Sequence, residues 1–276
     1  MPDNVSPAGL FDAETVRSFL RTERIGREGK LLFLKETDST NDEAARQAAA
    51  GAGDGLFIVA DKQNAGKGRR GRAWKDEGGV NTAMSILLRP DMKPDTAPML
   101  TLIMALSVQG AVKKITGLKT FIKWPNDIVC NGKKLVGILT EMAEENESIK
   151  HVVIGTGINI NQEIFPEEIR DTATSLYLES GKKYSRAEIT AECANGFEYY
   201  YGIFRRDLSL KSLKDEYNAE CVNCGRRVKV LDPSGEYEGE AEGIEDNGNL
   251  LVRINDNSVR EVRSGEVSVR GVYGYV

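Results

Sequence analysis

Residues 56–74 read LFIVADKQNAGKGRRGRAW, an apolar segment that leads directly into a basic, glycine-rich loop. The apolar part, residues 56–60, has the length and composition of a buried strand. Gly66, Gly68 and Gly71 satisfy the GxGxxG pattern of dinucleotide sites, but turn residues and a second apolar strand follow them instead of a helix. Because such a site needs a helix N-terminus at the pyrophosphate, the sequence argues against a Rossmann domain.

The loop itself is a local positive site on an acidic protein. Residues 62–72 contain five basic side chains and no acidic one, whereas the whole chain has 37 Lys and Arg against 42 Asp and Glu. The overall balance argues against a general nucleic-acid binder and favours a small anion as the partner of the loop. Glycines let the backbone approach a ligand closely while the cations surround it, so phosphate is the expected anion.

Strands and helices alternate on both sides of the loop. Helices are predicted at residues 12–21, 40–51, 98–115 and 185–204, and strands at residues 31–34, 80–88, 121–124, 128–130 and 151–161. Thr40 with Glu43 has the spacing of a capping box at the start of the second helix. Asn131-Gly132 is a strong hairpin signal, so the next segment is expected to return as a strand.

The sequence changes character near Cys221. From Val228 onward it reads as short strand-like segments separated by turn residues, which is the pattern of a small all-β barrel. We therefore expect an N-terminal helical segment at residues 1–30, a mixed α/β domain at residues 31–221 and a small β-barrel domain at residues 222–276. The first 30 residues have room for one amphipathic helix but not for a winged-helix domain.

Composition and the N-terminus exclude several classes of protein. The sequence does not open on a basic segment followed by an apolar one, and its uninterrupted apolar runs are far shorter than the roughly 18 residues of a membrane span. We therefore expect a cytoplasmic protein with no membrane partner. Four cysteines are too few for a disulfide scaffold in 276 residues, and Cys221 and Cys224 with one histidine, His151, do not make a four-ligand metal site.

Two further segments carry informative side chains. KWPND at residues 123–127 places a cation, an amide and a carboxylate between a strand and a hairpin, and the Asp127 carboxylate is of a type that holds Mg²⁺. An Asn-Asp pair in such a place is also common turn chemistry. Lys134 lies in the apolar return strand, where a lysine must reach solvent or an anion, and Gly137 near it permits close approach of a ligand.

Five motifs together resemble those of the biotin protein ligases. They are DSTN at residues 38–41, QNAGKGRRGRAW at 63–74, KWPND at 123–127, KLVGIL at 134–139 and GTGIN at 155–159. Their order and spacing match as well, and residues 239–252 are similar to the C-terminal barrel of the family. The resemblance implies an α/β (α+β) fold, in which a mixed-sheet biotin/lipoate ligase-like catalytic domain precedes a small all-β barrel of the Src-homology-3 type.

The resemblance implies a two-step reaction with biotin and ATP as substrates and Mg²⁺ as the metal. The biotin carboxylate attacks the α-phosphate of ATP and releases pyrophosphate. A lysine of a carboxylase biotin carrier domain, the expected protein partner, then attacks the biotinyl-5′-AMP. Lys134 and Arg69 are expected to act in catalysis by gathering and neutralising the carboxylate and phosphate groups.

The resemblance also implies a role for each matching residue. The biotin site is expected to contain Ser39, Thr40, Asn41, Gln63, Gly66, Lys67, Gly68, Arg69, Lys134, Gly137 and Gly157. The ATP or adenylate site is expected to contain Arg70, Arg72, Trp74, Lys123, Asn126 and Asn159, with Asp127 positioning Mg²⁺. Hydroxyl and amide groups suit the buried ureido ring of biotin because they both donate and accept hydrogen bonds.

The chain departs from the family pattern at Lys67, a position that the family commonly fills with arginine. A lysine keeps the charge but loses the bidentate fork of a guanidinium. Family members that also act as repressors carry an N-terminal winged helix, for which the first 30 residues of this chain have no room. We therefore expect a monofunctional ligase that does not bind DNA. The sequence leaves a homodimer open.

Two alternative functions are considered. A lipoate ligase has a related fold and the same adenylation logic, and it differs in which acid drives pyrophosphate release from ATP. A module that binds single-stranded nucleic acid would need aromatic side chains that stack on bases near the basic loop. Trp74 is the aromatic residue near that loop, so this second alternative ranks last.

Overall fold

The structure is a computed structural model that describes residues 9–75, 77–232, 235–255, 258–264, 268–271 and 275–276. Its large mixed sheet contains β1 (Leu31–Leu34), β2 (Leu56–Ala60), β3 (Thr82–Leu88), β4 (Thr120–Lys123), β5 (Asp127–Cys130), β6 (Lys133–Glu145) and β7 (Ser148–Ile158). These strands lie in the order β1-β2-β3-β7-β6-β5-β4. The pair β1 and β2 is parallel, and every other neighbouring pair is antiparallel.

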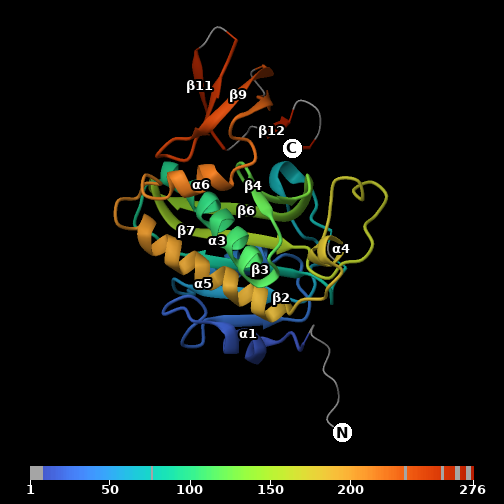
Figure 1. Cartoon of the computed structure of the whole chain (residues 1–276). Coiled ribbons are helices and arrows are strands. Elements are labelled where there is room, and N and C mark those ends of the chain that lie inside the picture. Colours follow the sequence, from blue (N-terminus) through green and yellow to red (C-terminus); the bar gives the residue numbers. More distant parts are fainter. Residues whose placement is uncertain (1–8, 76, 233–234, 256–257, 265–267, 272–274) are drawn as a thin grey trace.

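A second, antiparallel sheet forms the C-terminal part, which stands at one end of the main body in Figure 1. It contains β8 (Arg226–Leu231), β9 (Tyr237–Ile244), β10 (Leu250–Arg253), β11 (Val259–Val262) and β12 (Ser268–Gly271), in the order β11-β10-β9-β8-β12. The predicted fold class, a mixed α/β domain followed by a small all-β domain, is confirmed.

Helices cover the large sheet unequally. The helices are α1 (Ala13–Phe19), α2 (Thr40–Ala49), α3 (Met99–Thr116), α4 (Leu176–Ser180), α5 (Arg186–Phe204) and α6 (Lys214–Glu220). Helix α3 packs against β4 to β7 on one face of the sheet, and α5 packs on α3, as Figure 1 shows. Helix α2 packs on β2, β3 and β7 through a separate small cluster of apolar side chains. The part of the sheet next to α2 is therefore available for a binding site.

Helix α3 is apolar on nearly all sides because it lies between the sheet and α5. It begins after Pro98 and ends at Gly117, which has a φ of 71° and caps the helix in the left-handed conformation. Residues Pro94–Thr116 are long and apolar enough to cross a membrane, and this is the one such helix among the described residues. Most of its residues are buried inside the fold, as is typical of a core helix.

Trp124 joins the two sheets. Its side chain is 1% exposed, and its Nε1 donates a hydrogen bond of 3.0 Å to the carbonyl oxygen of Gly248 in the turn between β9 and β10. Its backbone N–H donates to Asn223 Oδ1 at 2.8 Å, and Val222 donates to the carbonyl of Ile122 at 2.8 Å. The KWPND motif thus contains predicted site residues and also forms the junction with the C-terminal sheet.

Most predicted elements are confirmed, and one cap is corrected. Ser39, not Thr40, is the N-cap of α2, because its side chain accepts a hydrogen bond from the backbone of Asn41 while Thr40 already has helical geometry. The hairpin turn at Asn131-Gly132 is confirmed, with φ values of 47° and 77°. The prediction missed α4 and α6, which are short helices without an extended apolar period.

Candidate active site

A row of glycines forms the floor of a pocket on the open part of the sheet. In the strand register, Gly157 of β7 lies beside Gly137 of β6, and Gly155 lies beside Leu139. A Cβ atom added to Gly157 would lie 2.4 Å from the Trp74 ring, and one added to Gly155 would lie 2.0 Å from Asn41 Oδ1. Side chains from outside the sheet therefore occupy the space that Cβ atoms would need.

Uncharged polar groups line one end of this pocket, where α2 begins. Gln63 Oε1 accepts hydrogen bonds from the backbone N–H of Thr40 at 2.8 Å and from its hydroxyl at 3.1 Å. Ser85 Oγ, on the neighbouring strand β3, lies 2.8 Å from Thr40 Oγ1 and 2.7 Å from Asn41 Oδ1. Asn41 also donates to Glu141 Oε2 at 2.7 Å. These buried bonds fix the directions of the donors and acceptors before a ligand enters.

The basic loop folds back on itself over the pocket. The backbone N–H of Trp74 donates to Gly66 at 2.8 Å, and that of Gly68 donates to Arg72 at 2.7 Å. Arg70 at the tip has a φ of 58°, and Gly71 follows with a φ of 71°, so the tip has the left-handed geometry of a tight hairpin turn. The loop therefore presents its side chains in a defined arrangement.

Lys67 connects the loop to the first turn of α2. Its ammonium group forms a salt bridge with Asp42, and this contact raises the pKa of Lys67 above its ordinary value. The predicted biotin-site lysine therefore lines the pocket while its charge is paired with the helix.

Arg69 is anchored to residues outside the loop. Its guanidinium donates to Asn126 Oδ1 at 2.9 Å and to the backbone carbonyl of Ser264, which comes from the C-terminal sheet domain. Burial lowers its pKa from the ordinary value, although an arginine stays charged at neutral pH. Asn126 is held in turn by its donation to the carbonyl of Ile138 at 3.0 Å.

Lys134 and Asp127 form an ion pair at the other end of the pocket, with 2.7 Å between Nζ and Oδ1. Burial alone would raise the pKa of Asp127, but the charges of Lys134 and Lys123 outweigh it and hold that pKa below its ordinary value. Burial lowers the pKa of Lys123 to about 8. The expectation that Lys134 must find an anion is therefore met by Asp127.

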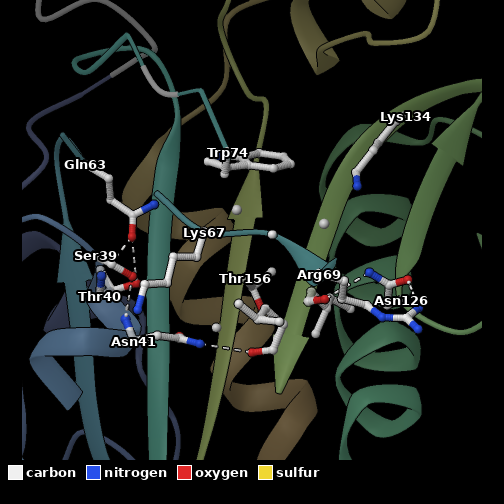
Figure 2. A pocket seen from close by; sticks show the side chains of 16 residues that line it. Ser39, Thr40, Asn41, Gln63, Lys67, Arg69, Trp74, Asn126, Lys134 and Thr156 are labelled. Carbon is white, nitrogen blue, oxygen red and sulfur yellow. Dashed lines mark hydrogen bonds between the residues drawn. The ribbon is translucent and has the colours of Figure 1, made fainter. Parts of the chain in front are cut away.

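Trp74 divides the two ends of the pocket. Figure 2 shows its indole between Gln63 on one side and Lys134 on the other, with Asn41 and Arg69 below it. Trp74 Nε1 lies against the glycine floor and is buried without a hydrogen-bond partner among the described residues. Unsatisfied buried polar atoms at a cavity are expected where a ligand supplies the missing partner.

The structure brings most of the predicted site residues together. One pocket is lined by Ser39, Thr40, Asn41, Gln63, Lys67, Gly68, Arg69, Trp74, Asn126, Lys134, Gly137 and Gly157. An adjoining cavity is lined by further predicted residues, Arg70, Arg72, Lys123 and Asp127. The basic loop, the glycine floor and the KWPND motif thus form one continuous site.

Two predicted site residues lie outside both cavities. Asn159 is 4% exposed, and its Nδ2 donates to the carbonyl of Thr174 at 3.0 Å, so it secures the chain after β7 instead of facing the pocket. A Cβ on Gly66 would come within 2.6 Å of the Trp74 carbonyl oxygen and 2.9 Å of Gln63 Nε2. Its role in the structure is to allow the loop to fold back.

Several residues that line these cavities were not expected from the sequence. They include Ile138, Leu139, Gly155, Thr156, Arg270 and Tyr275. The period of two along a strand could have placed Gly155 on the same face as Gly157. Arg270 and Tyr275 reach the site because the C-terminal domain packs against it, and no local pattern indicates such a contact.

The predicted magnesium role of Asp127 does not fit the structure. Its Oδ1 pairs with Lys134, and its Oδ2 accepts a hydrogen bond from the hydroxyl of Tyr275. Mg²⁺ requires oxygen ligands in octahedral geometry, whereas ammonium groups surround this carboxylate. Within the described residues, no group of three acidic, histidine or cysteine side chains could hold a metal ion. Asp127 is instead the partner of Lys134.

Comparisons with known proteins agree with this architecture. Residues 33–159 match the model of the biotin/lipoate A/B protein ligase family, and residues 224–270 match that of the biotin protein ligase C-terminal domain. The bifunctional ligase/repressor BirA of Bacillus subtilis is 36% identical over 265 residues, which cover 95% of this chain and 80% of that protein.

Two further relatives extend the comparison. The biotin acetyl-CoA-carboxylase ligase of Mycobacterium tuberculosis is 32% identical over 257 residues, covering 90% of this chain and 93% of that protein. The structure of the biotin protein ligase from Aquifex aeolicus in complex with biotin and ATP superposes with a TM-score of 0.76 at 32% identity, covering 87% of this chain and 98% of that one. The chain described here therefore belongs to the biotin/lipoate A/B protein ligase family.

Proposed function

We propose that this chain is an ATP-dependent biotin protein ligase, which converts biotin to biotinyl-5′-AMP and transfers biotin to a lysine of a carboxylase carrier domain. One observation carries the proposal. A single pocket runs from an end rich in hydroxyl and amide groups, where the cation Lys67 is paired with Asp42, to an end lined by Arg69 and Lys134. A ligand with a polar ring at one end and a carboxylate at the other fits this polarity.

The end rich in hydroxyl and amide groups suits the ureido ring of biotin. That ring has two N–H donors and one carbonyl acceptor, and the hydroxyl groups of Ser39 and Thr40 can both donate and accept. Thr40 and Gln63 are already hydrogen-bonded to each other, and this contact fixes the orientation of their remaining donors and acceptors. The indole of Trp74 packs over Gly157 and can cover a flat, apolar ring system.

The cationic end suits the reaction between two anions. A biotin carboxylate oxygen forms a bond to the α-phosphorus of ATP, and the bond between that phosphorus and the bridging oxygen breaks, releasing pyrophosphate. Lys134 and Arg69 reduce the repulsion between the carboxylate and the phosphate and stabilise the charge that develops on the α-phosphate. Lys123, Arg70 and Arg72 in the adjoining cavity are placed for the remaining phosphates.

The second step takes place at the same site. The acceptor lysine amine attacks the carbonyl carbon of the mixed anhydride, an amide bond forms, and AMP leaves with the electrons of the broken bond. Arg69 links the loop to Asn126 and to the C-terminal domain through Ser264. This connection would hold the loop over the adenylate until the acceptor arrives.

A lipoate ligase is the alternative within the same family, because the family model covers both biotin and lipoate ligases. The similar ligase of Mycobacterium tuberculosis and the similar structure from Aquifex aeolicus are both named for biotin, which favours the first assignment. The nucleic-acid alternative has less support, since the Trp74 ring packs on the glycine floor instead of standing free for stacking.

Exchange of labelled pyrophosphate into ATP tests the proposal. The purified chain is expected to catalyse exchange that depends on biotin, with lipoate giving no more than the rate without any acid. A biotin carrier domain should then become labelled at its single acceptor lysine, and a carrier with that lysine replaced by arginine should not. Exchange driven by lipoate, or no exchange with biotin, would contradict the assignment.

A further inference from the structure

Tyr275, near the end of the sequence, lies in the cavity that holds the phosphate-side cations. Its hydroxyl donates a hydrogen bond to Asp127 Oδ2, and the Nζ atom of Lys123 lies 3.6 Å from the centre of its ring. No motif singled out this residue, and the reaction proposed above does not use it. Both contacts are long-range in sequence, so the packing of the C-terminal domain brings Tyr275 here.

Asp127 connects Tyr275 to the reacting groups. One carboxylate oxygen binds the Tyr275 hydroxyl, and the other forms the 2.7 Å ion pair with Lys134. The Asp127 side chain is 11% exposed, so water has little access to replace a lost partner. Figure 2 shows the amino group of Lys134 directed into the pocket between Trp74 and Asn126. The direction of the carboxylate therefore determines where this amino group sits.

We propose that Tyr275 is a positioning residue for biotin activation, because its hydroxyl holds the Asp127 carboxylate in the orientation that aims the Lys134 ammonium at the reacting oxygens. This inference rests on the proposed function. The Tyr275 hydroxyl is proposed to contact neither substrate and to act through Asp127.

The two parts of the Tyr275 side chain have separable effects. The hydroxyl acts on Asp127 and hence on the placement of Lys134, which matters most in the transition state. The ring covers the ammonium of Lys123, and a cation held against an aromatic face in a buried site keeps a defined position. Because Lys123 is placed for the phosphates, loss of the ring should weaken ATP binding.

Two variants test these parts. Tyr275→Phe keeps the ring and removes the hydroxyl, so kcat for biotin-dependent pyrophosphate exchange should fall about tenfold or more while the KM values for biotin and ATP stay unchanged. Tyr275→Leu removes both parts, so KM for ATP should rise as well. The matched control is Tyr200→Phe, which removes a tyrosine hydroxyl bonded to Glu216 on the surface and should leave all constants unchanged.

A double-mutant cycle with Asp127→Asn identifies the route of the effect. If Tyr275 acts through Asp127, Tyr275→Phe should lower kcat in the parent and cause no further decrease in the Asp127→Asn background. A purely structural role would instead lower the thermal unfolding midpoint of Tyr275→Phe and leave kcat of the folded enzyme unchanged. Equal kcat for the parent and Tyr275→Phe overturns the inference, even if Asp127→Asn does not fold.

The same experiment separates this inference from the proposed function. A parent enzyme without biotin-dependent exchange would contradict the function itself. A parent enzyme that exchanges normally, with a Tyr275→Phe variant of equal kcat, would contradict only the positioning role.

Discussion

The two faces of the large sheet are built from alternate residues of the same strands, and they have opposite packing. Toward α3 and α5, strands β3 and β7 present Met84, Ile86 and Ile154, which are fully buried in the main core. On the other face, the intervening positions include Ser85, Gly155 and Gly157, which line or support the pocket. The comparison shows that the site lies where the strands carry glycines in place of large side chains. The apolar side chains of the opposite face stabilise the sheet that supports the site.

Replacement of a core residue should affect stability and leave the site alone. Ile154→Ala removes a fully buried side chain from the α3 face and should lower the free energy of unfolding by about 2–5 kcal/mol. Urea unfolding measures this change. At a temperature where the variant is folded, its KM for biotin should equal that of the parent. A large change in KM with little loss of stability would show that the two faces are not independent.

Replacement of Lys134, the proposed catalytic lysine, should have the reverse effect. Lys134→Ala removes the cation at the reacting end of the pocket and should slow biotin-dependent pyrophosphate exchange by about 10²–10³-fold, or roughly 2.7–4 kcal/mol. The neighbouring Lys133→Ala is the control, because Lys133 contacts the backbone of Arg170 outside the pocket. Exchange at the parent rate in Lys134→Ala with saturating biotin would remove this residue from the reaction.

An added methyl group on the floor should test the glycine row. The Cβ of Gly157→Ala would lie 2.4 Å from the Trp74 ring, so the indole must move into the ligand space. Overpacking of this kind costs about 1–3 kcal/mol, which corresponds to a rise in the biotin KM of about 5-fold to 150-fold if the cost falls on binding. Gly202→Ala on α5 has open space around its Cβ and should bind biotin as the parent does. Equal affinity in both variants would contradict the role of the floor.

The smallest expected effect is a pH dependence from Lys123. Burial lowers its pKa to about 8, so its charge is lost as the pH rises through that value. The kcat/KM for ATP, which reports the free enzyme, should therefore fall above about pH 8, and Lys123→Arg should remove the fall. Between about pH 8 and 10.4 the unfolded state binds more protons, so this group makes the free energy of unfolding rise with pH. A parent profile that stays flat through this range would contradict the assignment.

Local patterns predicted the elements that build the floor and the loop, because a strand period, a Pro-initiated helix and an Asn-Gly turn depend on nearby residues. They did not predict which partner a polar side chain chooses in space. The Asn159 side chain donates a hydrogen bond to the carbonyl of Thr174, and Asp127 forms an ion pair with Lys134 where a metal was expected. The approach of Ser264 and Tyr275 depends on how two domains pack, which no single segment encodes.

A crystal structure with a non-hydrolysable analogue of biotinyl-5′-AMP tests the central claim most directly. The ureido ring of the analogue is expected to lie beside Thr40 and Gln63 on the glycine floor. The linkage that mimics the anhydride is expected to lie between Arg69 and Lys134. The adenylate phosphate should contact the cations of the adjoining cavity. An analogue bound on any other surface, or bound with its ring at the cationic end, would contradict the account.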